Sequence, residues 1–246
     1  MDDMLRALTA LLTEFFSSSV TNERKREIEN LLSDFGRRED SWKQCLFFLT
    51  HTDDQYVMMF CLNALEEVIG RRWLRMLAEH KAEIRNGVQG FLLAHHKEVP
   101  TFVRNKLCKL VVDMGRLDWP HFYPTFFSSI LQLCQSSETC LTGLVLLKTA
   151  SEELACPRDD LSESRKVELR RLLLDQVPAT LNVALSSMWS ALRKNHLQCL
   201  EPETRLVCVH ALSCVDHLLS WIPLEHCSSN LLNTLFTFAS FGCSPE

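Results

Sequence analysis

Amphipathic helical periodicity runs through almost the whole chain, and this pattern limits its fold more than any other feature. In the first stretch, apolar residues recur at the three- and four-residue spacing of a helix: Met4, Leu5, Leu8, Leu11, Leu12, Phe15 and Phe16. The same spacing returns in segment after segment, with short polar or Pro- and Gly-bearing breaks between them. No segment shows the alternation of a strand. Helices should therefore cover roughly four-fifths of the chain, against about a third in an average protein.

The breaks and terminal residues divide the pattern into eleven expected helices. They are 4–16, 22–36, 40–49, 52–70, 76–96, 100–115, 120–135, 138–154, 163–195, 202–221 and 226–241. Pro100 and Pro202 should begin helices, because proline is favoured in a first turn. Pro178 should kink the long helix. Asp160 and Glu163 have the spacing of a capping box at its start.

A chain of this length with only short turns between helices has two plausible architectures, a single bundle or an α-solenoid. Helix pairs with apolar faces on two sides suit HEAT-type stacking, at about 40–47 residues per unit. We therefore predict an all-α protein, an α-solenoid of about five and a half HEAT-like antiparallel pairs. The single bundle is the alternative.

Composition and motifs exclude several classes of function. The net charge of −5 argues against bulk binding of nucleic acid. No apolar run approaches the roughly 20 residues of a transmembrane helix. With only 7 Gly there is no phosphate-binding glycine motif, and no metalloprotease or nucleophile-elbow motif occurs, so we expect no enzyme and no cofactor. The 11 Cys form no CxxC pair and no secretory signal is present, which indicates the cytosol or nucleus.

Four segments carry a family resemblance. Residues 55–75, QYVMMFCLNALEEVIGRRWLR, look like the importin-β N-terminal pattern. Residues 107–127, LCKLVVDMGRLDWPHFYPTFF, and residues 206–224, LVCVHALSCVDHLLSWIPL, resemble exportin motifs, in exportin order. Between them, LVLLKTASEEL resembles another helix of the same fold. The chain thus resembles the N-terminal part of an exportin, in the branch of the family that exports actin–profilin complexes.

This resemblance implies an organisation and a set of partners. Residues 1–100 would be importin-β N-terminal-like HEAT repeats of the Ran-binding type. Residues 101–246 would be exportin-type repeats, truncated at the C-terminus, in one continuous solenoid. The implied function is non-catalytic nuclear export. The partners would be Ran in its GTP form, a protein cargo such as actin–profilin, and nucleoporin Phe-Gly repeats, with shuttling between nucleus and cytoplasm and no nucleic-acid or membrane partner.

Exportins bind Ran on the concave face formed by the second helix of each pair, and two such helices here carry polar stripes. The candidate Ran contacts are Asn63, Glu66, Glu67 and Arg71 on one helix and Asn105, Lys109, Asp113 and Arg116 on the other. The simpler interpretation of each single residue is a solvated face, because every surface helix has one. A HEAT scaffold that binds no GTPase is the alternative function.

Three other features have competing interpretations. Trp119, Phe122, Tyr123, Phe126 and Phe127 could form a ligand platform, but packing between helix pairs is favoured. His210, Cys214 and His217 share one helical face and could bind zinc with His226 or Cys227 as a fourth ligand, although a mildly polar helix face is the simpler interpretation. Arg71, Arg72 and Arg75 could bind phosphate, but capping of a helix end is favoured. Residues 228–241 carry no charge, so self-association is expected.

Overall fold

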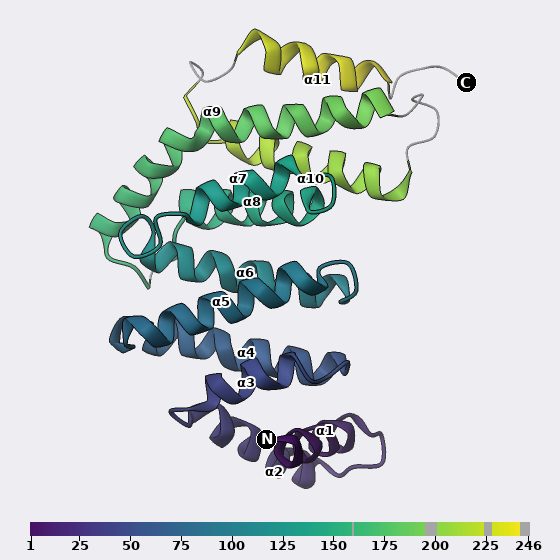
Figure 1. The fold of residues 1–246 in the computed structure, drawn as a ribbon, viewed down its shortest axis with the longest axis vertical. Coiled ribbons are helices and arrows are strands. Elements are labelled where there is room, and N and C mark those ends of the chain that lie inside the picture. Colours follow the sequence, from purple (N-terminus) through teal and green to yellow (C-terminus); the bar gives the residue numbers. More distant parts are fainter. Residues whose placement is uncertain (159, 195–200, 224–227, 242–246) are drawn as a thin grey trace. The chain divides into compact units, whose positions relative to one another are not determined.

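The chain is all-helical in the computed structural model, which describes residues 1–158, 160–194, 201–223 and 228–241. These residues form eleven α-helices and one 3-10 helix, η1. The helices are α1 (Asp2–Phe16), α2 (Asn22–Arg37), α3 (Ser41–Leu49), α4 (Gln55–Arg72), η1 (Trp73–Arg75), α5 (Ala78–His95), α6 (Thr101–Asp118), α7 (Phe126–Gln135), α8 (Cys140–Ala155), α9 (Glu163–Lys194), α10 (Pro202–Leu219) and α11 (Ser229–Phe241). Successive helices run antiparallel (Figure 1). The predicted class, an all-α HEAT-like solenoid of helix pairs, is confirmed.

The chain divides into two compact units, Met1–Met114 and Gly115–Glu246. In the first unit α1 packs on α2, and α3 packs on α4 and α5. Its core is formed by side chains such as Phe48, Leu62 and Leu65, which are fully buried. No helix among the described residues combines the length and apolar character needed to cross a membrane.

Arg72, at the end of α4, ties the second helix pair to the first. Its guanidinium donates to the carbonyl oxygens of Gly36, Arg37 and Arg38 at the end of α2, at 3.4, 2.6 and 2.8 Å. These are terminal carbonyls that a helix leaves without partners. The arginines were expected to cap the helix that precedes them, α4; Arg72 instead caps α2, so the prediction is wrong about the helix.

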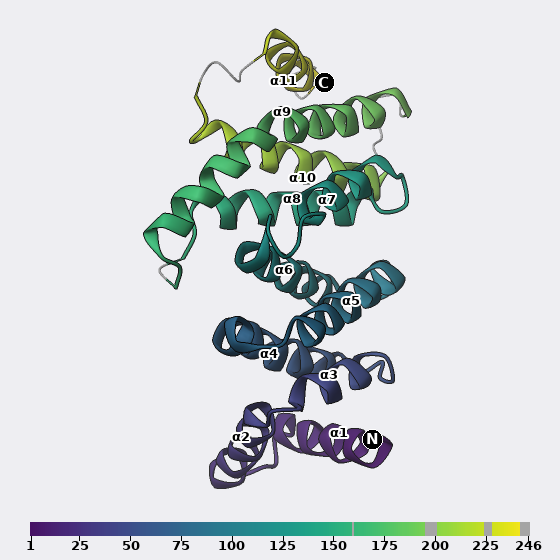
Figure 2. The ribbon, with the colours of Figure 1, turned by 60° about the vertical axis from the view of Figure 1, so that its left-hand side comes forward.

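In the second unit α8 is the central helix. It packs against α7, α9 and α10, and ten of its 16 residues are buried, which explains its nearly continuous apolar sequence. Close approach to α7 requires Gly143, because a Cβ there would lie 2.7 Å from the backbone nitrogen of Cys134. Helix α11 lies against α9 on the side away from α8 (Figures 1 and 2).

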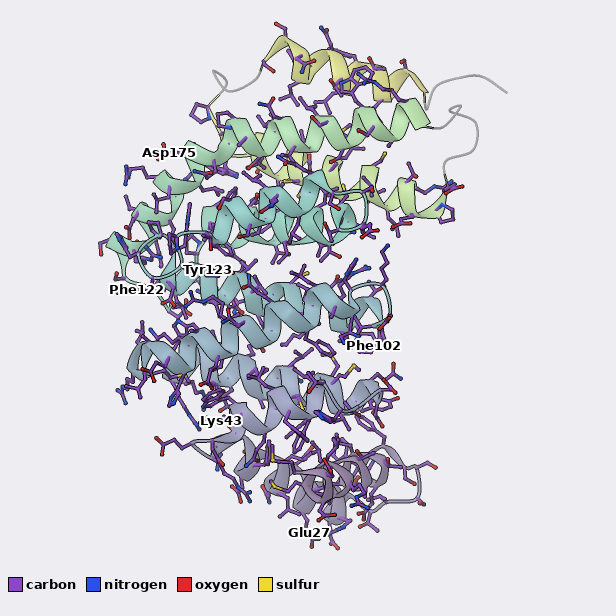
Figure 3. The ribbon with its side chains drawn as sticks, viewed as in Figure 1. Glu27, Lys43, Phe102, Phe122, Tyr123 and Asp175 are labelled. Carbon is purple, nitrogen blue, oxygen red and sulfur yellow. The ribbon has the colours of Figure 1, made fainter. Side chains whose placement is uncertain are left out.

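The turn between α6 and α7 is held by aromatic packing. Trp119 is 4% exposed and stacks on Phe127 with ring centroids 5.6 Å apart. Tyr123 and Phe126 are buried beside it, and Gly115 is required because a Cβ there would lie 2.4 Å from the Phe126 ring. Packing is thus confirmed over a ligand platform. Phe122 is the exception, since it is 74% exposed next to buried Tyr123 (labelled in Figure 3).

Two predicted helix starts need correction. The helix expected at 120 begins at Phe126, because Trp119 and Tyr123 each precede a proline and are disfavoured from helical geometry. Helix α4 is capped by Asp54, whose carboxylate accepts from the backbone N–H groups of Tyr56 and Val57, and not by Thr52 or Asp53.

Helix α9 begins at Glu163, as predicted, but its cap differs from the prediction, whereas its kink does not. Ser162 accepts from the backbone N–H of Arg165, so the predicted Asp160–Glu163 capping box is wrong. Pro178 does lie inside α9, and the helix bends near Asp175, which is labelled in Figure 3. Proline at 178 removes a helical hydrogen bond one turn earlier, which accounts for a bend at that place.

Replacing Trp119 by alanine should loosen the second unit selectively. Loss of a buried tryptophan costs about 3–5 kcal/mol, and in stacked repeats the loss acts mainly on neighbouring helices. Hydrogen exchange should therefore accelerate in the last turn of α6, in α7 and in α8, and remain unchanged in α1–α3. A uniform loss of protection from α1 to α11 would instead indicate one cooperative bundle.

The exposed apolar face of α11 should cause self-association. Leu231 is buried, whereas Leu232 and Phe236, one turn apart, are 46% and 72% exposed. Sedimentation velocity should detect concentration-dependent oligomers that Phe236→Glu reduces. The matched control is Val209→Glu on α10, which changes an exposed apolar residue elsewhere. A monodisperse monomer of the unmodified chain at high concentration would contradict this prediction.

Candidate partner-binding surface

The stripe on α4 is accessible and held by ion pairs. Asn63 is exposed, and Glu67 and Arg71 form an i,i+4 pair with oxygen and nitrogen 2.8 Å apart. The opposite face of the same helix buries Val57, Cys61 and Val68. The amphipathic sequence of α4 thus fixes which side chains remain available to a partner.

An ion pair joins the two second helices α4 and α6. Lys106 Nζ on α6 donates to Glu66 Oε2 on α4 at 2.6 Å, across 40 residues of sequence. The carboxylate side chain is 38% exposed and the ammonium side chain 19%. This pair brings Glu66 of α4 and Lys106 of α6 together. Asn63 and Asn105 are exposed on the same two helices, and Glu67 is half-buried.

Three of the predicted contact residues form ion pairs with other residues of the chain. Lys109 Nζ donates to Asp113 Oδ1 at 2.5 Å, and the Asp113 side chain is only 5% exposed. The Arg116 side chain is 3% exposed and forms a bidentate pair with Asp160, at 2.5 and 2.9 Å. The Asp113 and Arg116 side chains are buried, so the expectation that they lie on an accessible stripe is corrected. The accessible stripe consists of Asn63, Glu66, Glu67, Arg71 and Asn105, with Lys109 partly buried at its edge.

A polar network around Arg116 fixes the turn after α6 in the second unit. Arg165 of α9 donates to the carbonyl oxygens of Arg116 and Trp119 and pairs with Glu168 at 2.6 Å. The Arg116 guanidinium lowers the pKa of Asp160 below its ordinary value of 3.8 by hydrogen bonding. Hydrogen bonds from Arg165, and then His121, similarly lower the pKa of Glu168.

The zinc hypothesis gains no support from the geometry. Cys214 is fully buried and its thiol lies 3.9 Å from the Ser151 hydroxyl, while burial raises its pKa to about 12. No group of three His, Cys, Asp or Glu side chains among the described residues is arranged to hold a metal. His226 and Cys227, the candidate fourth ligands, lie outside the described residues.

The sequence interpretation did not single out Lys106 or Arg165, and it assigned Asp160 to a helix cap rather than to an ion pair with Arg116. For Lys106 a signal existed, because it lies one HEAT repeat of about 40 residues after Glu66 and carries the opposite charge. For Asp160 and Arg165 no local signal exists. Their partners, Arg116 and Trp119, are more than forty positions away and meet them only through folding.

Replacing Asp160 by asparagine should destabilise the chain at neutral pH. Arg116 would remain buried without the Asp160 carboxylate. The free energy of unfolding should therefore fall by an amount between about 1 kcal/mol, the value of an exposed ion pair, and about 3–5 kcal/mol, the cost of breaking a buried one. Because folding lowers the pKa of Asp160, its stabilisation is present above the unfolded value and is lost as pH falls through the folded value.

Urea unfolding at pH 7 and near pH 3 measures this difference. The difference in free energy of unfolding between the parent chain and D160N should be smaller near pH 3 than at pH 7. Asp175→Asn, which alters an exposed carboxylate on the following helix α9, is the control. An equal difference in free energy of unfolding at both pH values would show that the Arg116–Asp160 ion pair does not cause the destabilisation.

Comparison with known protein families gives a consistent result. A model described as "Exportin 1-like protein" matches residues 100–243, and one described as "Importin-beta N-terminal domain" matches residues 28–94. Proteins called Exportin-6 from Mus musculus, Homo sapiens and Danio rerio are 47%, 46% and 45% identical over 97% of this chain. The chain spans about a quarter of their length, 23–24%. The resemblance stated from the sequence motifs is thereby confirmed, and the chain belongs to the exportin family.

Proposed function

We propose that this chain is the Ran-GTP-engaging part of a nuclear export receptor, and that it acts by binding rather than by catalysis. The observation that supports the proposal is the Glu66–Lys106 ion pair, which joins two second helices, α4 and α6. Exportins use the second helices of their N-terminal repeats to bind Ran. An importin-β N-terminal domain match over residues 28–94 supports the same assignment.

The other partners in this proposal follow from family resemblance. The cargo would be a protein, actin–profilin by resemblance to its branch of the family, and nucleoporin Phe-Gly repeats would contact the receptor during passage. Such a receptor shuttles between nucleus and cytoplasm. Ran and cargo would each raise the affinity of the other, because coupling between two binding sites is reciprocal.

Ran loaded with GTP should bind this chain more tightly than Ran loaded with GDP. The GTP form orders switch segments that a preformed helical surface can recognise. A pull-down with each nucleotide form, followed by titration, measures the preference. Equal binding to both forms, or none at high micromolar concentration, would favour the alternative, a HEAT scaffold that binds no GTPase.

Substitutions in the stripe localise the contact. The triple variant Asn63→Ala, Glu67→Ala, Asn105→Ala should weaken Ran-GTP binding by about tenfold, a typical loss for several interface truncations. The matched control is Glu79→Ala, Glu83→Ala, Asn86→Ala, which removes similar exposed polar groups from α5. If the control weakens binding as much as the stripe variant does, the surface assigned to Ran is wrong.

A further inference from the structure

The turn between α4 and α5 exposes two leucines. Leu74, in η1, is 80% exposed, and Leu77, just after it, is 63% exposed. A single exposed leucine is ordinary on a protein surface. Two of them only three residues apart concentrate apolar surface at one short turn, and such surface commonly marks a place where another molecule binds.

The residues around these leucines are anchored to the first unit. Trp73 is 1% exposed, and its carbonyl oxygen accepts from the backbone N–H of Met76 at 3.1 Å. Arg72, just before η1, donates to the terminal carbonyls of α2. Anchoring on both sides of Leu74 limits the conformational freedom that would be lost when a partner binds there.

The segment that carries the leucines is positively charged. Residues 71–81 contain one carboxylate, Glu79, and four cations, Arg71, Arg72, Arg75 and Lys81, although the net charge of the whole chain is −5. Arg75 lies between the two leucines in the sequence and is exposed. It forms no ion pair with any residue that the structure describes. Its guanidinium is therefore available to a carboxylate from outside the chain.

Two more exposed cations lie beside this turn. Arg38 follows α2, and its carbonyl oxygen accepts from Arg72 at 2.8 Å. The Lys43 ammonium group, labelled in Figure 3, lies 5.2 Å from the centroid of the Trp42 ring. The Trp42 ring in turn lies 5.2 Å from that of His80, in the first turn of α5. Neither Arg38 nor Lys43 pairs with a carboxylate in the described part of the chain, so cations from three segments gather at one edge of the first unit.

We propose that this edge is a docking site for an acidic protein segment with apolar side chains at its centre. We call it the basic edge, and it consists of Arg38, Lys43, Leu74, Arg75 and Leu77. The leucines would contact the apolar side chains, and the cations would pair with the flanking carboxylates, as arginine clusters do in the recognition of acidic motifs. The inference is independent of the Ran proposal, because none of these five residues belongs to the stripe assigned to Ran.

Exposed carboxylates within the basic edge favour a protein segment over an anionic membrane. Glu39, Asp40 and Glu79 are exposed among the cations. A lipid surface with continuous negative charge would face these three carboxylates together with the cations and would be repelled by them. A protein segment can place its carboxylates beside the cations alone.

The test uses a fluorescent 12-residue peptide with four leucines between two groups of four glutamates, titrated into the native chain and followed by anisotropy. Two matched peptides replace the leucines by serines or the glutamates by lysines. The glutamate–leucine peptide should bind at micromolar concentration, and each matched peptide at least about tenfold more weakly. Hydrogen exchange of the unmodified chain should slow at residues 73–80 when this peptide is bound.

A variant and its matched control localise the contact. The variant Lys43→Glu, Arg75→Glu, Leu77→Ser should weaken binding at least about tenfold. The control Arg26→Glu, Leu93→Ser, Lys97→Glu makes the same types of change at exposed positions on α2, at the end of α5 and just after it, and should leave binding unchanged. Circular dichroism checks that both variants are folded.

Several results would overturn the proposal. One is no binding of the glutamate–leucine peptide at high micromolar concentration. Another is equal binding of the lysine–leucine peptide, which is the result expected if the peptides bind the uncharged face of α11 instead. Binding to vesicles that contain phosphatidylserine without binding to the peptide would identify the edge as a membrane contact. Because the comparison of peptides and the exchange footprint use the unmodified chain, they decide the question even if the variant does not fold.

Discussion

Burial of apolar surface between consecutive helices is the interaction on which the rest of this chain depends. A helix such as α8 packs against three others and is buried over most of its length. Such a helix can keep few polar groups. The polar side chains are therefore confined to the faces that stacking leaves open, and the stripe on α4 and α6 is one of these faces. The same constraint that builds the fold thus determines where a partner can bind.

Where polar groups do enter the interior, they position the backbone. Arg72 satisfies the terminal carbonyls of α2, and Arg165 does the same for the turn that carries Trp119. The Arg116–Asp160 pair holds the last turn of α6, and the Lys109–Asp113 pair links two consecutive turns within α6.

The sequence predicts the helices well because each carries a strong 3.6-residue pattern and its own termini. The prediction fails where prolines interrupt the helical pattern and where a residue distant in the sequence determines the contact. The sequence analysis placed residues 120–125 in a helix, yet Pro120 and Pro124 delay α7 to Phe126. Asp160 has the spacing of a cap, but the distant Arg116 binds it instead. For the same reason Asp113 and Arg116, which look like surface charges on a polar stripe, are buried. The role of Lys106 is visible only in the structure, where it pairs with Glu66 of α4.

The most direct test of the Ran-binding account is a hydrogen-exchange footprint of the chain with and without Ran-GTP. The account predicts slowed exchange in the central turns of α4 and the first turns of α6, around Asn63–Arg71 and Asn105. It predicts no change along the exposed face of α5. Protection confined to α5, or an unchanged exchange pattern at saturating Ran-GTP, would contradict the assignment of this surface.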